Sequence, residues 1–112
     1  RGKGRSMADR IEQLRRMLDT EPNDAFCLYA LGQEYAREGQ FEAAQAHLGQ
    51  SIEADPDQPY AHYHRAKCLM QLGRIDESRQ VIDEGLALSE RLGDMQAAGE
   101  LAELRQTAQH DG

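Results

Sequence analysis

Residues 25–58 of the 112-residue chain read AFCLYALGQEYAREGQFEAAQAHLGQSIEADPDQ and hold its clearest helical pattern. Its apolar residues recur at intervals of three and four, as in Leu28, Leu31 and Tyr35, which places them on one face of a helix. A second run of the same spacing follows Gly39. Glycine enters the left-handed backbone conformation at little cost, so Gly39 marks a turn between two helices. The stretch therefore predicts a helical hairpin.

The hairpin repeats along the chain with a period of 34 residues. With that shift Gly39 falls on Gly73 and Tyr29 falls on Tyr63. A period of this length is typical of stacked helical hairpins rather than of a single closed core. No segment alternates between apolar and polar residues with a period of two, so we expect no strands.

Helix stop signals divide the chain into six expected helices. The run Asp55-Pro56-Asp57 ends one helix, and Pro59 suits the first turn of the next. Asn23 and Asp24 each offer an N-cap. The expected helices cover about residues 7–20, 24–38, 41–54, 59–72, 75–92 and 94–109.

Residues 25–58 resemble one full tetratricopeptide repeat, and residues 59–92 resemble a second, weaker copy. The first resemblance is carried by Leu28, Leu31, Gly32, Tyr35, Gly39, Phe41, Ala44, Leu48 and Pro56, and the second by Ala66, Leu69, Gly73, Ile75 and Ile82. Residues 7–22 match the second helix of a preceding repeat, and residues 93–109 the first helix of a following one, ending as a cap. The resemblance implies one domain over residues 7–112. It also implies an all-α fold, a right-handed superhelical stack of antiparallel helical hairpins (a TPR-like α-solenoid).

Two departures from the family pattern lie in the fifth expected helix. Gly85 stands in its interior, where it should cost about 1 kcal/mol relative to alanine. Glu90 stands where the family often has proline, so we expect this helix to run on toward Gly93.

The resemblance also implies a binding surface, because the first helix of each hairpin lines a concave groove in this family. Helical spacing predicts two equivalent stripes of groove residues: Phe26, Tyr29, Gln33, Ala36 and Arg37 on one helix, and Tyr60, Tyr63, Lys67, Met70 and Gln71 on the next. Aromatic and cationic groups together suit a peptide or protein segment with apolar side chains and carboxylate groups. The alternative is that Phe26 and Tyr60 pack against neighbouring helices.

Some family members hold a chaperone's C-terminal carboxylate with a clamp of Lys, Asn and Arg. This chain has Tyr29, Gln33, His64, Asp94 and Ala98 at the corresponding places, which argues against that activity.

Composition excludes several classes of protein. The chain is 39% hydrophobic and 29% charged, too polar for a membrane span and too apolar for a disordered chain. Its net charge of −7 argues against a nucleic-acid binder. Residues 1–6, RGKGRS, precede Met7 and are interpreted as a remnant of recombinant expression, while Met7 and the polar tail favour a small complete protein. We expect a cytoplasmic protein in which Cys27 and Cys68 are buried free thiols.

Nothing in the sequence predicts catalysis, a cofactor or a metal. There is no phosphate-binding loop, no HExxH and no EF-hand. His62 and His64 are two residues apart, about 200° around a helix, and cannot share an ion without help. His47 is only faintly similar to a phosphotransfer histidine, and Arg65 is expected to form an ion pair with a neighbouring helix.

We therefore predict a non-catalytic protein–protein interaction module. The alternative is a structural or self-associating module, with a homodimer formed through the C-terminal helix, where Leu101 and Leu104 share a face with Ala98 and Ala102.

Overall fold

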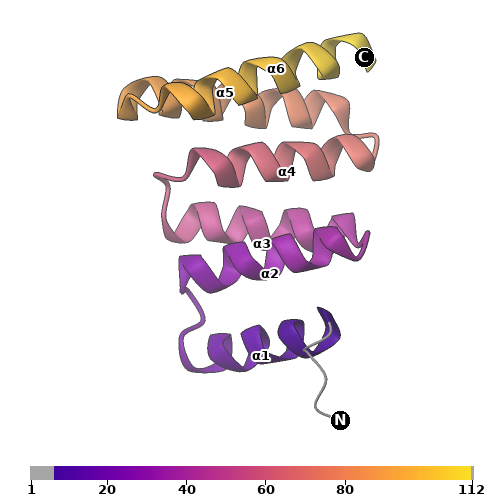
Figure 1. Ribbon diagram of the computed structural model, residues 1–112, viewed down its shortest axis with the longest axis vertical. Helices are drawn as coiled ribbons and strands as arrows, with labels where there is room; N and C mark the ends of the chain where they lie inside the picture. The colour runs from indigo at the N-terminus through magenta and orange to yellow at the C-terminus, as the bar shows by residue number, and fades with distance from the viewer. Residues whose placement is uncertain (1–6, 112) are drawn as a thin grey trace.

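The computed structural model describes the backbone of residues 7–111 and the side chains of residues 9–108. The proposed expression remnant, residues 1–6, lies outside the described residues. The helices of the described part are α1 (Met7–Thr20), α2 (Ala25–Arg37), α3 (Phe41–Ala54), α4 (Pro59–Gln71), α5 (Ile75–Leu92) and α6 (Met95–Asp111) (Figure 1). This part of the chain contains no strand, and the predicted all-α fold of six helices is confirmed.

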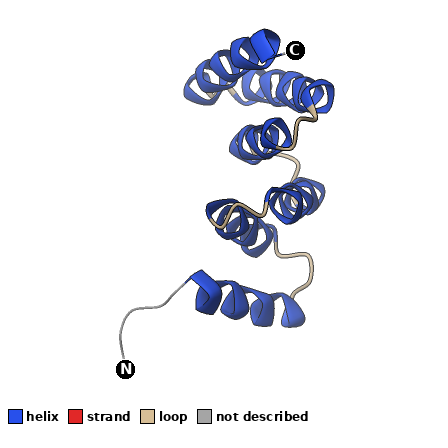
Figure 2. Ribbon diagram, turned by 90° about the vertical axis from the view of Figure 1, so that its right-hand side faces the viewer, coloured by secondary structure: helices blue, strands red, loops and turns tan. Residues whose placement is uncertain are grey.

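The helices stack along the long axis of a molecule that measures 46 × 28 × 21 Å. α2 packs on α3 and α4 packs on α5 as hairpins, while α3 also packs on α4 and α5 on α6. Figure 2 shows the result as two staggered columns, with α2, α4 and α6 in one and α3 and α5 in the other. α4 touches both α2 and α6, so these three helices form one continuous surface, called here the α2–α4–α6 face. None of the described helices is both long and apolar enough to cross a membrane.

The turns follow from local chemistry. Gly39, Gly73 and Gly93 have φ angles of 78°, 77° and 72°, in the left-handed region where an L side chain is strained. A Cβ atom at any of the three would meet nothing within 4 Å, so conformation and not crowding requires glycine there. Of the two candidate caps, Asp24 is the one used, since its side chain accepts a hydrogen bond from the Cys27 N–H.

Two clusters of buried apolar side chains hold the stack together. The first joins α1, α2 and α3 and includes Ile11, Leu14, Cys27, Ala30, Leu31, Tyr35, Ala44 and Leu48, with Cys68 from α4. The second joins α4, α5 and α6 and contains Ala66, Leu69, Val81, Ile82, Leu101 and Ala108. Among the described residues α1 packs only on α2, so it depends on the first cluster.

Glycines also permit close helix packing. A Cβ on Gly32 would lie 2.6 Å from Leu48 Cγ, which explains why α2 and α3 require glycine here. In α5 a Cβ on Gly85 would lie 2.9 Å from His62 Cβ and 3.1 Å from Leu101 Cδ1. An alanine methyl group at position 85 would therefore be crowded by α4 and α6, and this crowding opposes the gain in helix propensity that alanine would bring. The fifth helix does run on to Leu92, as its missing proline predicts.

Candidate functional site

All the predicted stripe residues except Met70 line hollows on the α2–α4–α6 face. The first, the apolar hollow, has a volume of about 410 Å³ and lies between the first turns of α2 and α4. The second, the polar hollow, has a volume of about 250 Å³ and lies between the last turns of the same helices. The apolar hollow is lined by Ala25, Phe26, Tyr29, Asp55, Gln58, Pro59, Tyr60 and Ala61, and the polar hollow by Gln33, Ala36, Arg37, Phe41, His64, Lys67, Cys68 and Gln71.

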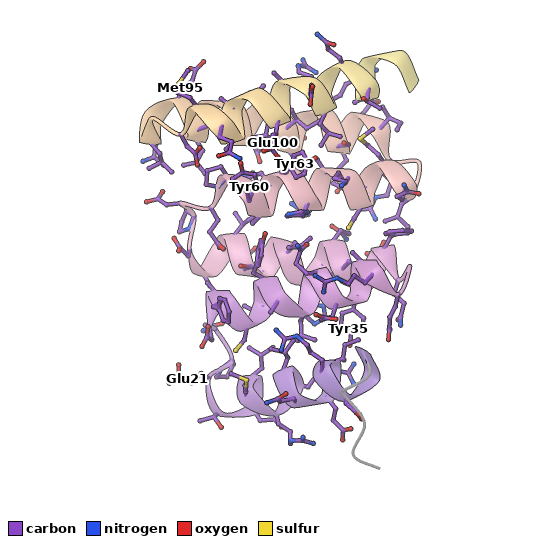
Figure 3. All side chains as sticks on the ribbon, in the orientation of Figure 1. Glu21, Tyr35, Tyr60, Tyr63, Met95 and Glu100 are labelled. Carbon is purple, nitrogen blue, oxygen red and sulfur yellow. The ribbon has the colours of Figure 1, made fainter. Side chains whose placement is uncertain are left out.

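Two aromatic side chains, Phe26 and Tyr60, border the apolar hollow. Phe26 is 70% exposed, so its side chain is not buried against a neighbouring helix. Tyr60 is half-buried, and its hydroxyl donates a hydrogen bond to Glu100 Oε2 on α6 at 3.2 Å. Figure 3 shows Tyr60, Tyr63 and Glu100 together where α4 meets α6. The expected alternative of helix packing therefore applies to Tyr60 but not to Phe26.

The polar hollow carries two cations. Arg37 Nη1 lies 2.6 Å from Glu34 Oε2, yet the arginine side chain remains 59% exposed. Glu34 also receives Arg10 Nε from α1 at 3.1 Å, so the carboxylate is shared between two guanidinium groups. Lys67 Nζ lies 5.3 Å from the centroid of the Tyr63 ring, a cation–π contact. Both cations thus have charge available for a ligand.

His64 lines the polar hollow and contacts the aromatic rings of both neighbouring hollows. Its ring lies edge-on to Tyr29 and Tyr63, with centroids 5.9 and 5.2 Å away. Its Nε2 lies 3.5 Å from Gln33 Nε2, a contact between α4 and α2. Burial lowers the pKa of His64, and Lys67 lowers it further. These surroundings favour the neutral imidazole, which can both donate and accept a hydrogen bond.

Two stripe residues, Tyr63 and Met70, are half-buried against the second apolar cluster. Tyr63 nevertheless lines a further hollow of about 200 Å³, the acidic hollow, with Glu100, Glu103, Leu104 and Thr107 of α6. The stripe prediction omitted these α6 residues, and it also omitted His64, Phe41 and Cys68. A strict 34-residue shift could not find the α6 set, since α2 and α4 begin 34 residues apart but α4 and α6 begin 36 apart.

The two cysteines and the histidines His47 and His62 make contacts within the fold. Cys27 and Cys68 are buried free thiols, as predicted, and burial raises the pKa of each. His62 Nδ1 lies 3.1 Å from the Gln58 carbonyl oxygen, and His47 Nδ1 lies 2.8 Å from that of Ala43. Over the described residues no group of three or more His, Cys, Asp or Glu side chains is placed to hold a metal ion.

Arg65 differs from its expected ion pair. Its Nε donates a hydrogen bond to the amide oxygen of Gln45 at 3.1 Å, and its guanidinium packs over Gly49. The partner is therefore a neutral side chain of α3, and the role remains structural.

Known proteins are similar to this chain in sequence and in fold. The family model described as tetratricopeptide repeat matches residues 35–99. The chain belongs to the tetratricopeptide repeat family. A TPR repeat-containing protein of Pseudomonas aeruginosa is 32% identical over 91 residues, which cover 81% of this chain and 87% of that protein. The sequence resemblance to tetratricopeptide repeats is thus confirmed.

Solved tetratricopeptide structures superpose on nearly the whole chain. The TPR2B domain of yeast Sti1, in a complex with pHsp70, has a TM-score of 0.89 and 18% identity, covering 95% of this chain and 85% of that one. PcrH, in complex with the chaperone binding region of PopD, has a TM-score of 0.86 and 19% identity, covering 93% and 79%. These likenesses establish the fold, a tetratricopeptide helical solenoid.

Proposed function

We propose that this chain is a non-catalytic adaptor or scaffold module that binds a peptide or protein segment along the α2–α4–α6 face. The observation that carries the proposal is the 70% exposure of Phe26 at the rim of a hollow lined mostly by apolar and aromatic groups. Aromatic side chains at apolar hollows are enriched among the residues that contribute most to binding. Two similar folds support it, because Sti1 and PcrH are each solved in complex with a protein partner.

The chemistry of the two hollows defines the ligand. The apolar hollow suits an aliphatic or aromatic side chain, which would be covered by Phe26 and Tyr60. The polar hollow presents Arg37 and Lys67, which suit a carboxylate. The proposed ligand is therefore a segment with at least one large apolar residue and at least one acidic group.

Capture from a lysate of the source organism tests this proposal. The immobilised chain is compared with Phe26→Ala and Lys67→Ala, whose side chains are exposed and whose removal should leave the fold intact. We expect a protein that the wild type captures to be lost or reduced about tenfold by each substitution. Tyr63→Ala is avoided because Tyr63 packs on the second apolar cluster.

The matched control is Met17→Ala, a substitution of an exposed apolar residue on α1, outside the α2–α4–α6 face. It should capture the same protein as the wild type. If all four chains capture the same proteins in equal amounts, this face is not the binding surface.

Self-association is the second candidate function, and a different surface favours it. Leu92 and Met95, at the α5–α6 turn, are 44% and 77% exposed. Figure 3 shows Met95 at that end of α6. Leu101, in contrast, is fully buried within the chain and is not free to join two copies. Sedimentation equilibrium of the wild type and of Leu92→Ser/Met95→Ser decides this candidate, since only a dimer formed through the turn would dissociate on substitution.

A further inference from the structure

The charges along the α2–α4–α6 face change sign from one end to the other. The polar hollow between α2 and α4 has two cations on its lining, Arg37 and Lys67. The acidic hollow beside α6 has two carboxylates, Glu100 and Glu103. Tyr63 lies at the boundary, because its ring contacts Lys67 and also lines the acidic hollow.

We propose that the segment bound on this face carries charges of opposite sign, an acidic group over α2 and α4 and a basic group over α6. This inference rests on the proposed peptide-binding function and defines the ligand further. It follows from the charge complementarity that each end of the face offers.

The charges at both ends are available to a ligand. Among the described residues, neither Lys67 nor Glu103 has an ion-pair partner, and both side chains are exposed. Glu100 accepts hydrogen bonds from the Tyr60 hydroxyl at 3.2 Å and the Gln96 amide at 3.3 Å. Both of these donors are neutral, so the negative charge of Glu100 is not compensated by them.

The geometry sets the spacing between the two charges. Packed helices lie about 8–10 Å apart, and an extended chain advances about 3.3 Å per residue, so one helix step needs about three residues. A segment that reaches from Lys67 on α4 to Glu103 on α6 makes one such step, and a segment that starts at Arg37 on α2 makes two. The acidic and basic groups of the ligand should therefore lie about three to six residues apart.

Synthetic peptides test the charge pattern directly. Fluorescent peptides of about ten residues share a central Phe in a neutral frame and differ in their charged residues. Two carry an acidic pair and a basic pair on opposite sides of the Phe, in either order, and two carry charges of one sign only. With the full chain, fluorescence anisotropy should show the better bipolar peptide binding about tenfold tighter than either single-sign peptide.

A charge reversal on α6 provides the second measurement. Glu103→Lys should weaken the better bipolar peptide about tenfold and strengthen the all-acidic peptide, since the two ends of the face then have the same sign. Glu84→Lys is the matched control: it changes the net charge equally at an exposed site on α5, outside the three hollows, and should leave both affinities unchanged.

The outcomes separate this inference from the proposed function. The all-acidic peptide could bind as tightly as the better bipolar one, with an affinity that Glu103→Lys does not change. That result would overturn the proposed charge pattern but not the proposed peptide site. If none of the four peptides binds at concentrations up to about 1 mM, the charge pattern is overturned. Lysate capture with Phe26→Ala then decides separately whether the face binds any partner.

Discussion

His64 is a titratable side chain of the α2–α4–α6 face, and its surroundings shift its pKa. It lies between the rings of Tyr29 and Tyr63, partly out of water. Burial lowers its pKa below the ordinary value of 6.5, Lys67 lowers it further, Glu100 opposes the shift and Arg37 lowers it again. Protonation therefore costs more in the folded chain than in the unfolded chain.

We predict that this residue makes the free energy of unfolding fall in mild acid. Because the folded-state pKa lies below the unfolded value, the contribution is complete above about pH 6.5 and is lost as the pH falls through the folded-state pKa. Urea unfolding of the wild type and His64→Gln at about pH 7.5 and pH 5 measures it. The wild type should lose more stability than the variant between the two pH values. An equal loss in both proteins would assign the pH dependence to other groups.

At the scale of helices, Gly85 sets how closely α5 approaches its two neighbours. The nearest atoms to a methyl group added at this position would be a Cβ of α4 and a leucine methyl of α6, and the first of these is fixed to the backbone. Relief would require α5 to move away from α4. The substitution that normally strengthens a helix should here separate helices.

We predict that Gly85→Ala lowers the free energy of unfolding by about 1–3 kcal/mol, although alanine is the better helix former. Gly99→Ala is the internal control, because a Cβ at Gly99 on α6 would meet no atom within 4 Å. It should raise the free energy of unfolding by up to about 1 kcal/mol. Urea unfolding followed by circular dichroism gives both values, and a stabilised Gly85→Ala would contradict the close approach of α5.

Over the whole molecule, the first apolar cluster stabilises the N-terminal end of the stack and the second stabilises the C-terminal end. In the described part of the chain α1 contacts only α2, whereas α4 contacts α2, α3, α5 and α6. In a stack of this kind stability is roughly a sum of nearest-neighbour terms, and opening can be local. The N-terminal end should therefore open at a lower free energy than the middle.

Hydrogen exchange of two leucine variants measures that division. Leu14→Ala should speed exchange in α1 and change α5 and α6 little, because Leu14 belongs to the first cluster. Leu101→Ala should cost about 2–5 kcal/mol and speed exchange across α4, α5 and α6, where the second cluster lies. Uniform loss of protection over all helices in both variants would show that the stack opens as one unit.

The difference between local and non-local information explains how much the sequence predicts. Helix positions follow from caps, prolines and turn glycines, which act within a few residues, so the expected boundaries lie within one or two residues of those observed. The stripe on α2 and α4 likewise follows from helical spacing. The acidic hollow cannot be predicted from helical spacing, because it depends on the greater length of α5 and on the contact of Tyr63 with α6. The need for glycine at position 85 depends on distant residues in the same way.

The three glycine turns have a stereochemical consequence. Gly39, Gly73 and Gly93 are exposed and have positive φ angles, opposite in sign to those that an L residue prefers. A D-alanine would adopt these angles without strain, at positions that face solvent. It would also restrict the unfolded chain, which is worth about 0.4–1 kcal/mol at a compatible site. A stack of helices built from L residues is thus joined at three turns where a D residue would suit the backbone better.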